Sequence, residues 1–182
     1  MAVAAGIMVP HPPLIVPDVG RGQEILIKDT IKAYQEAAGM AAELKPDTIV
    51  VISPHAVMYA DYFHVSPGKE ARGDFGRFMA PQIGVEAGYD EAFVRELDRL
   101  CGDDDFPMGT EGEREKELDH GTLVPLYFIN QHYRDYKLVR IGGSGLSFAD
   151  HYRAGRYIAR AAENLGRSVF IVASGDLSHK LR

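Results

Sequence analysis

The stretch VVISPHAV, residues 50–57, ends an apolar run abruptly and then presents a histidine at position 55. The run begins at Asp47 in DTIVVIS, and it is rich in β-branched residues and continuous instead of alternating. Such runs are typical of strands that are buried on both faces of a parallel sheet. Pro54 fixes the backbone where the run stops. We therefore predict a buried strand over residues 47–53 whose carboxyl end delivers His55.

The segments before this strand complete a β-α-β unit. In residues 23–45 the apolar side chains have the spacing of one face of an amphipathic helix, and Pro46 closes the pattern. Residues 2–9 form a shorter apolar run, which ends at prolines that flank His11. Because a strand, a helix and a second strand in this order form a crossover connection, we expect the two strands to be parallel.

The same alternation of elements returns in the last third of the chain. YKLVRIG (136–142) and SVFIVAS (168–174) are predicted strands, and residues 148–165 form a predicted helix that Gly166 caps. The fold class that follows is α/β, with a largely parallel or mixed central sheet covered by helices in a single domain over residues 1–182.

The middle of the chain is less regular. We interpret residues 69–87 as a loop or an insertion with short strands, because Gly, charged and aromatic residues alternate there without a period. Residues 89–101 form a modest predicted helix. The acidic, turn-rich residues 102–121 are interpreted as a solvated loop.

Composition and charge limit the classes of function. The chain has 182 residues, of which 46% are hydrophobic and 25% charged, and its formal net charge is −6 without a basic patch, so nucleic acid is not an expected partner. Cys101 is the single cysteine, which favours a reducing, cytoplasmic location. The apolar N-terminus lacks a charged leader and is broken by prolines, so we expect neither a signal peptide nor a membrane span.

Histidines follow three of the predicted strands. Ligands of open parallel sheets bind at the carboxyl ends of the strands, so His11 and His55 converge there if their strands are neighbours. The last strand delivers Ser174, Asp176, Ser178 and His179 at its carboxyl end, in ASGDLSHK. Since imidazole is both a common metal ligand and a general acid or base near neutral pH, this placement favours metal chemistry with a spare histidine for proton transfer.

A further histidine, His120, follows Asp119 at the start of the apolar segment LDHGTLVPLYF. Asp119 is interpreted either as a helix cap alone or as part of the site. His64, His132 and His151 are interpreted as surface or packing residues. The chain has no P-loop, no G-x-G-x-x-G after the first strand, no H-E-x-x-H and no C-x-x-C, and GGSGLS at 142–147 is interpreted as a turn.

Four blocks of sequence, VPHPPLIVPDVG, ISPHAVMYADYFHV, LDHGTLVPLYFI and ASGDLSHKL, resemble in this order the class III extradiol ring-cleavage dioxygenases. The resemblance is to the catalytic subunit type that opens protocatechuate-like catechols, and it extends to the dioxygenase-like domains of the AmmeMemoRadiSam system and the related Memo proteins. It implies that His11 and His55 are ligands of a non-haem iron(II), with zinc or another divalent metal as the alternative ion.

The resemblance also implies roles for the remaining residues. His179 matches the acid/base histidine beside the iron, and His120 matches a second active-site histidine near substrate and oxygen. Asp176 and Ser178 would shape the turn that carries His179, as Pro54 shapes the turn before His55. The family completes its metal site with a glutamate that lies well downstream of the motif matched by His179, so we expect the chain to be C-terminally incomplete.

Two histidines and one carboxylate make up the usual iron(II) site of oxygenases. Asp61, Glu86 and Glu111 are carboxylates in predicted loops, but their spacing does not identify any of them as the third ligand.

Three functions remain open at this point. The first is iron(II)-dependent extradiol cleavage of a small catechol-type substrate with dioxygen. The second is a Memo-like protein of the same superfamily that binds a metal or ligand in a modification pathway or with a protein partner. The third is a zinc hydrolase that uses His11, His55 and a carboxylate. The resemblance further implies dimers or larger homo-oligomers.

Overall fold

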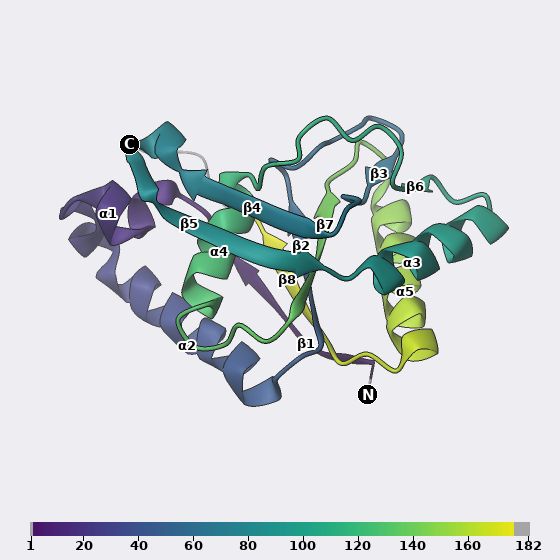
Figure 1. Cartoon of the computed structure of the whole chain (residues 1–182), viewed down its shortest axis with the longest axis horizontal. Coiled ribbons are helices and arrows are strands. Elements are labelled where there is room, and N and C mark those ends of the chain that lie inside the picture. Colours follow the sequence, from purple (N-terminus) through teal and green to yellow (C-terminus); the bar gives the residue numbers. More distant parts are fainter. Residues whose placement is uncertain (1, 177–182) are drawn as a thin grey trace.

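The computed structural model describes residues 2–176. Within this range six strands form a mixed central sheet (Figure 1). Five of them run parallel, and the sixth is an antiparallel edge strand. Their order across the sheet is β1 (Val3–Val9), β8 (Val169–Ser174), β2 (Thr48–Ser53), β7 (Lys137–Gly142), β5 (Ala80–Tyr89) and β4 (Glu70–Phe75). A separate parallel pair consists of β3 (Phe63–His64) and β6 (Met108–Gly109).

Helices cover both faces of the sheet, as Figure 1 shows. One face carries α1 (Pro17–Gly20), α2 (Lys28–Leu44) and α4 (His120–Ile129), and the other carries α3 (Glu91–Asp103) and α5 (Phe148–Leu165). Short 3-10 turns are η1 (Pro13–Ile15), η2 (Gln23–Ile27) and η3 (Gly76–Phe78). The predicted fold class, an α/β domain with a mixed, helix-covered sheet, is confirmed.

The interior of β2 explains why its sequence is apolar without alternation. Ile49 and Val51 belong to the core shared with α2 and α4, whereas Val50 belongs to the core shared with α3 and α5. All three side chains are fully buried. Since successive side chains of a strand point to opposite faces, a strand with helices on both sides must be apolar at every position.

The two N-terminal strands are parallel but are not neighbours, because β8 lies between them. β8 pairs in parallel with β1 through Val9 and Ser174, and with β2 through Ile52 and Ala173. The crossover from β1 to β2 therefore skips one position, which a strand from the far end of the chain fills. The carboxyl ends of all three strands still meet at one edge of the sheet.

The short strands expected within residues 69–87 are present, but the interpretation of this segment as a loop or an insertion was wrong. This segment forms the antiparallel pair β4 and β5, and β5 continues the main sheet through β7. Glycines obscured the strand pattern because they sit where backbones approach closely. A Cβ at Gly84 would lie 3.0 Å from the carbonyl oxygen of Gly73, and a Cβ at Gly73 would lie 2.7 Å from that of Leu118.

Two further boundaries differ from the prediction. The predicted helix over residues 23–45 starts with η2, and regular α-helix begins only at Lys28. Most acidic side chains of the segment 102–118 are exposed, but that of Glu113 is largely buried. The end of the segment is anchored, because Leu118 N donates to the carbonyl oxygen of Arg72 at 2.9 Å, so the chain runs beside β4 as it enters α4.

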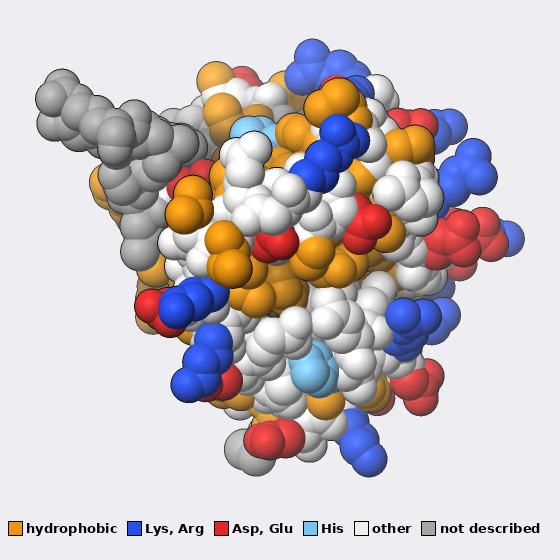
Figure 2. Space-filling view, turned by 90° about the vertical axis from the view of Figure 1, so that its left-hand side faces the viewer, with side chains coloured by type: hydrophobic (Ala, Val, Ile, Leu, Met, Phe, Trp, Pro, Cys, Tyr) orange, Lys and Arg blue, Asp and Glu red, His pale blue; other side chains and the backbone are white. Residues whose placement is uncertain are grey.

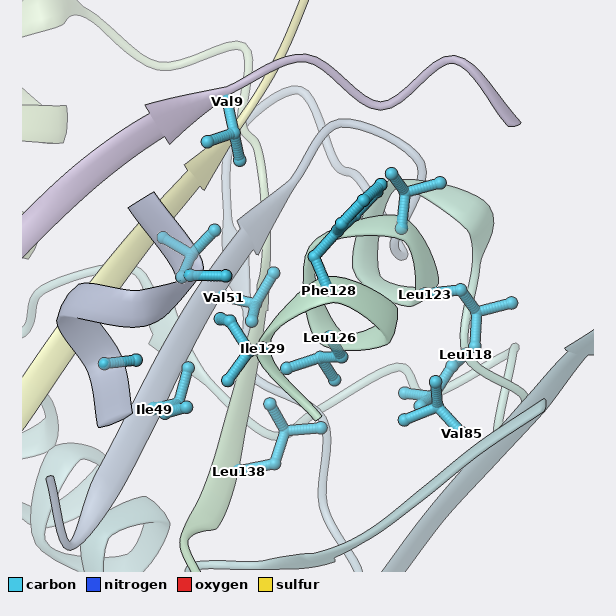
Figure 3. Packing of buried hydrophobic residues seen from close by; sticks show 14 of the residues in the cluster. Val9, Ile49, Val51, Val85, Leu118, Leu123, Leu126, Phe128, Ile129 and Leu138 are labelled. Carbon is cyan, nitrogen blue, oxygen red and sulfur yellow. The ribbon is translucent and has the colours of Figure 1, made fainter. Parts of the chain in front are cut away.

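Helix α4 is the most deeply buried helix of the described chain. It contacts α2, β2, β8, β5 and β4, and Figure 3 shows Leu126 and Ile129 packed toward Ile49, Val51 and Leu138. Eight of its ten residues are buried, which accounts for a sequence that is apolar all round. Burial of each large side chain, such as that of Leu126, stabilises the fold by about 1.5–3 kcal/mol.

The surface carries both signs of charge. On the face drawn in Figure 2, basic and acidic side chains are interspersed and no single-sign patch covers it. Among the described residues, no helix is both long enough and apolar enough to cross a membrane.

Candidate metal centre

His11 lies directly after β1 and is only 2% exposed. The prolines on either side of it restrict the backbone, and the turn is fixed by hydrogen bonds at its start. The hydroxyl of Tyr34 in α2 donates to the carbonyl oxygen of Pro10 at 2.9 Å, and Gly175 N donates to that of Val9 at 3.0 Å. The ring is therefore held between β1, β8 and α2.

Ser174, at the end of β8, and Asp176, just after it, provide polar contacts to His11. Its Nδ1 lies 2.9 Å from the hydroxyl of Ser174, and its backbone N–H donates to Asp176 Oδ1 at 3.1 Å. The other carboxylate oxygen of Asp176 lies 3.8 Å from His11 Nε2. Asp176 thus ties the segment after β8 to the turn after β1.

His55 follows β2 in a turn that Pro54 begins. The hydroxyl of Ser53, at the end of the strand, accepts from the backbone N–H of His55 at 3.1 Å and donates to Asp119 Oδ1 at 2.5 Å. His55 Nε2 lies 3.1 Å from His11 Nε2. The two nitrogens that would bind a metal therefore already point to one place.

Asp119 is the N-cap of α4 and presents His120 as the first residue of that helix. Its carboxylate accepts from the backbone N–H of Thr122 at 3.0 Å and from the hydroxyl of Thr122 at 2.9 Å. The fully buried guanidinium of Arg140, from β7, lies 3.9 Å from Asp119 Oδ2. Asp119 is therefore both a cap and, through Ser53, a support of the His55 turn.

Gly121 allows the histidines to come this close. A Cβ at this position would lie 2.4 Å from the hydroxyl oxygen of Ser53 and 3.3 Å from Cδ2 of His55. Any side chain here would displace the start of α4 from the end of β2. The sequence Asp-His-Gly at 119–121 thus combines a helix cap, a candidate site histidine and a close approach of two backbone segments.

Three imidazoles meet at the carboxyl edge of the sheet. The ligand atoms of His11, His55 and His120 all lie within 4.8 Å of one another. The ring centres of His55 and His120 are 4.0 Å apart, and those of His11 and His55 are 4.9 Å apart. Within residues 2–176 this is the group of three or more His, Cys, Asp or Glu side chains that could hold a metal ion, and Asp61, Glu86 and Glu111 do not belong to it.

Electrostatics keep His120 neutral. Burial, followed by the neighbouring rings of His55 and His11, lowers the pKa of His120 to about 4. A neutral imidazole has one donor and one acceptor nitrogen, so at pH 7 His120 can ligate a metal or offer a hydrogen bond to a bound molecule.

A cavity of about 520 Å³ opens beside His55 and His120. The rings of Phe78 and His120 pack in a T-shaped arrangement at a centroid distance of 5.4 Å, and Leu118 and Leu123 add apolar surface. Arg77, Arg114 and Lys116 contribute positive charge, and Asp74, Glu115 and Glu117 contribute negative charge. The cavity is large enough for a small aromatic molecule.

The structure brings most of the predicted site residues together: His11, His55, His120, Asp119, Asp176 and Pro54. His179 and Ser178 lie outside the described residues. His132 and His151 are exposed, as predicted, while His64 is fully buried. Sequence reasoning placed Ser174 at the same edge of the sheet but gave it no role. It missed Ser53 and Arg140, and the only available signal for Ser53 was its position at the end of a predicted strand.

Comparison with known proteins identifies a family whose match covers the candidate site residues. The sequence model described as the catalytic LigB subunit of aromatic ring-opening dioxygenase matches residues 5–182. The chain belongs to this family. The resemblance drawn from the four sequence blocks is thereby confirmed at the level of the dioxygenase family.

Two relatives are similar over most of this LigB-family chain. It is 38% identical to Protein CA_C1420 of Clostridium acetobutylicum over 96% of its own length, and 26% identical to 3,4-dihydroxyphenylacetate 2,3-dioxygenase of Escherichia coli over 82% of its length. The chain spans 39% of the length of the first relative and 56% of the second.

Proposed function

We propose that this LigB-family chain contributes the metal and substrate site of an iron(II)-dependent extradiol dioxygenase, which opens a catechol-type ring with dioxygen. The convergence of His11, His55 and His120 at the carboxyl edge of the sheet, beside a cavity, carries this proposal. Family membership supports the reaction class, and the 3,4-dihydroxyphenylacetate 2,3-dioxygenase relative supports an aromatic diol as substrate.

The donor set fits a divalent transition metal. His11 and His55 would hold the ion through Nε2 atoms that lie 3.1 Å apart and face each other. Imidazole suits iron(II), zinc and other first-row metals, so the residues fit iron without excluding the others. When bound, iron(II) would act as Lewis acid and template for the diol and for dioxygen.

The side chains around the ion would handle protons and position the ring. His120, neutral at pH 7, would donate a hydrogen bond to charge that develops on the substrate. His179 would accept a hydroxyl proton as the diol binds and later return it. The ring of Phe78 beside His120 would help to exclude water from the ring-binding side of the cavity.

A second function is favoured by one specific observation. Within residues 2–176 no carboxylate joins the three histidines in the candidate metal group. A Memo-like protein that binds a metal or small ligand without oxygen chemistry would need only such a histidine group. The oxygenase needs a carboxylate ligand from outside these described residues.

Oxygen uptake tests the proposal. The full-length protein is loaded anaerobically with iron(II), its iron content is measured, and uptake is followed with a panel of catechols. The proposed function predicts uptake coupled to a yellow ring-opened product. His11→Ala with His55→Ala should lose the iron, whereas the matched control His151→Ala, which changes an exposed histidine, should retain iron and activity.

Three results would contradict the oxygenase proposal. Iron retained by the double variant would exclude His11 and His55 as ligands. A sample that holds iron but consumes no oxygen with any catechol would favour the Memo-like function. Oxygen-independent cleavage of ester or phosphoester probes by the zinc-loaded protein would favour a hydrolase.

A further inference from the structure

Pro125 lies inside α4, and its side chain is buried. Proline has no backbone N–H, so it cannot donate to the carbonyl four residues earlier. In α4 that carbonyl belongs to Gly121, the residue after His120. A buried carbonyl without its helical donor is costly unless another group donates to it.

Ser174, the last residue of β8, is that other group. Its hydroxyl donates to the carbonyl oxygen of Gly121 at 2.5 Å, and the contact is buried. The proline in α4 and the serine in β8 are thus complementary features of two segments that lie far apart in the sequence.

This contact determines what Ser174 can do for His11. A serine hydroxyl has one proton to donate, and that of Ser174 is donated to the carbonyl oxygen of Gly121. The 2.9 Å contact between Ser174 and His11 Nδ1 must then be donated by the ring. The neutral ring of His11 therefore carries its proton on Nδ1 and its lone pair on Nε2.

The Nε2 of His11 is the nitrogen that faces His55. The 3.1 Å contact between the two Nε2 atoms is consistent with a lone pair on His11. Asp176 Oδ2 would favour a proton on the same nitrogen, but at 3.8 Å it lies beyond hydrogen-bond distance. A metal ligand needs a lone pair, and its other ring nitrogen commonly donates to a fixed acceptor.

We propose that Pro125 is a positioning residue which, through Gly121 and Ser174, sets the tautomer of His11. Its effect on metal binding rests on the proposed role of His11 as a ligand, but the tautomer itself does not. Pro125 touches neither metal nor substrate in this assignment. Because Pro125 has no N–H, the carbonyl of Gly121 is left to accept from the hydroxyl of Ser174. The oxygen of that hydroxyl then accepts the proton on Nδ1 of His11.

The tautomer is measured on the metal-free, full-length protein by ¹⁵N–¹H correlation NMR of the histidine ring nitrogens. Wild-type His11 should show a protonated Nδ1 and an unprotonated Nε2. Ser174→Ala should produce a detectable Nε2–H population, and Ser174→Thr, which keeps the hydroxyl, should restore the wild-type pattern. Pro125→Ala should also produce Nε2–H. The new backbone N–H gives the Gly121 carbonyl a second donor, so the hydroxyl of Ser174 can turn to donate to the ring without leaving that carbonyl unpaired.

Metal affinity gives the functional consequence. Cobalt(II) titration, followed by its visible spectrum, should show affinity lowered about 10–100-fold in Ser174→Ala and lowered in the same direction in Pro125→Ala. The control Pro17→Ala changes a proline at the start of α1, where no helical donor is needed, and should leave both readouts unchanged.

The outcomes separate the inference from the proposed function. A wild-type tautomer in Ser174→Ala would overturn the assignment of Ser174, and a wild-type tautomer in folded Pro125→Ala would overturn that of Pro125. Both results would leave the oxygenase proposal intact. The opposite result is also possible. If the His11 tautomer changes in both variants but the iron-loaded wild type never consumes oxygen, the inference is supported and the oxygenase proposal is contradicted.

Discussion

His64 provides a test of buried charge in this fold, because its protonation should make the protein sensitive to acid. The side chain is fully buried in β3, and both of its ring nitrogens lack a hydrogen-bond partner among the described residues. Glu113 lies 3.9 Å from Nε2 of His64, and its negative charge favours the protonated ring. The positive charges of Arg140, which lies 3.8 Å from Glu113, and of Arg114 disfavour protonation of His64. Burial is the largest effect, so the pKa of His64 is lowered from its usual value.

The sign of the pH dependence follows from this direction. In the unfolded chain His64 titrates near pH 6.5, whereas the folded protein resists protonation. The unfolded state therefore binds more protons as the pH falls, and stability that is present above pH 6.5 is lost below it. If the folded ring stays neutral, lowering the pH from 7.5 to 5.5 costs the wild type about 1.4 kcal/mol through this residue, and less if the ring takes up a proton.

The assay compares wild type with His64→Leu by urea unfolding at both pH values, with a chelator present so that bound metal does not contribute. The free energy of unfolding of the wild type should fall more between pH 7.5 and 5.5 than that of the variant, by up to about 1.4 kcal/mol. His64→Gln removes the titration with a smaller change in polarity and should show the same difference. Equal pH dependence in all three proteins, or a steeper loss in the variants, would refute the reasoning.

Three shorter predictions concern stability, each measured by urea unfolding. Ser53→Ala and Thr48→Val each remove a hydroxyl that donates to a buried carboxylate, so each should cost about 1.5–3 kcal/mol, but only Ser53→Ala should weaken cobalt(II) binding. Gly142→Ala places a Cβ 1.9 Å from the carbonyl oxygen of Val57 and should lower the free energy of unfolding by about 1–3 kcal/mol or more. At the neighbouring Gly143 the nearest atom, the sulfur of Met58, is 3.6 Å away, so Gly143→Ala should stay within about 0.5 kcal/mol of wild type. Gly39→Ala in α2 meets no atom within 4 Å and should raise stability by about 0.4–1 kcal/mol.

Local patterns were sufficient to predict the elements that carry the site. The apolar run before His55 and the prolines around His11 mark strand ends in any context, because both signals depend on a few adjacent residues. The helix over Phe148–Leu165 was predicted with its observed limits because periodicity and a cap residue agree. Family resemblance added His120, which spacing alone left open.

What the sequence did not predict depends on contacts between distant segments. Nothing local to β1 or β2 indicates that β8 inserts between them. Arg140 lies in an otherwise apolar strand. Its buried guanidinium donates hydrogen bonds to the backbone carbonyls of Glu115 and Glu117 and to the hydroxyl of Ser66, and the carboxylates of Glu113 and Asp119 lie within 3.9 Å of it. Those acceptors come from segments 23 to 74 residues away, which no periodicity reveals.

The same type of hydrogen bond occurs at both ends of β2, but only one of the two lies at the candidate metal centre. At the amino end Thr48 donates to Asp90, the N-cap of α3, and at the carboxyl end Ser53 donates to Asp119, the N-cap of α4. Both contacts join a strand hydroxyl to a capping carboxylate, so both stabilise the fold in the same way. Only the carboxyl end continues into a turn with a histidine, because ligand sites form where parallel strands end. The proposed contribution of Ser53 to metal binding therefore depends on its place at that edge. Thr48, which makes the same contact at the other end of the strand, serves as the control for its contribution to folding alone.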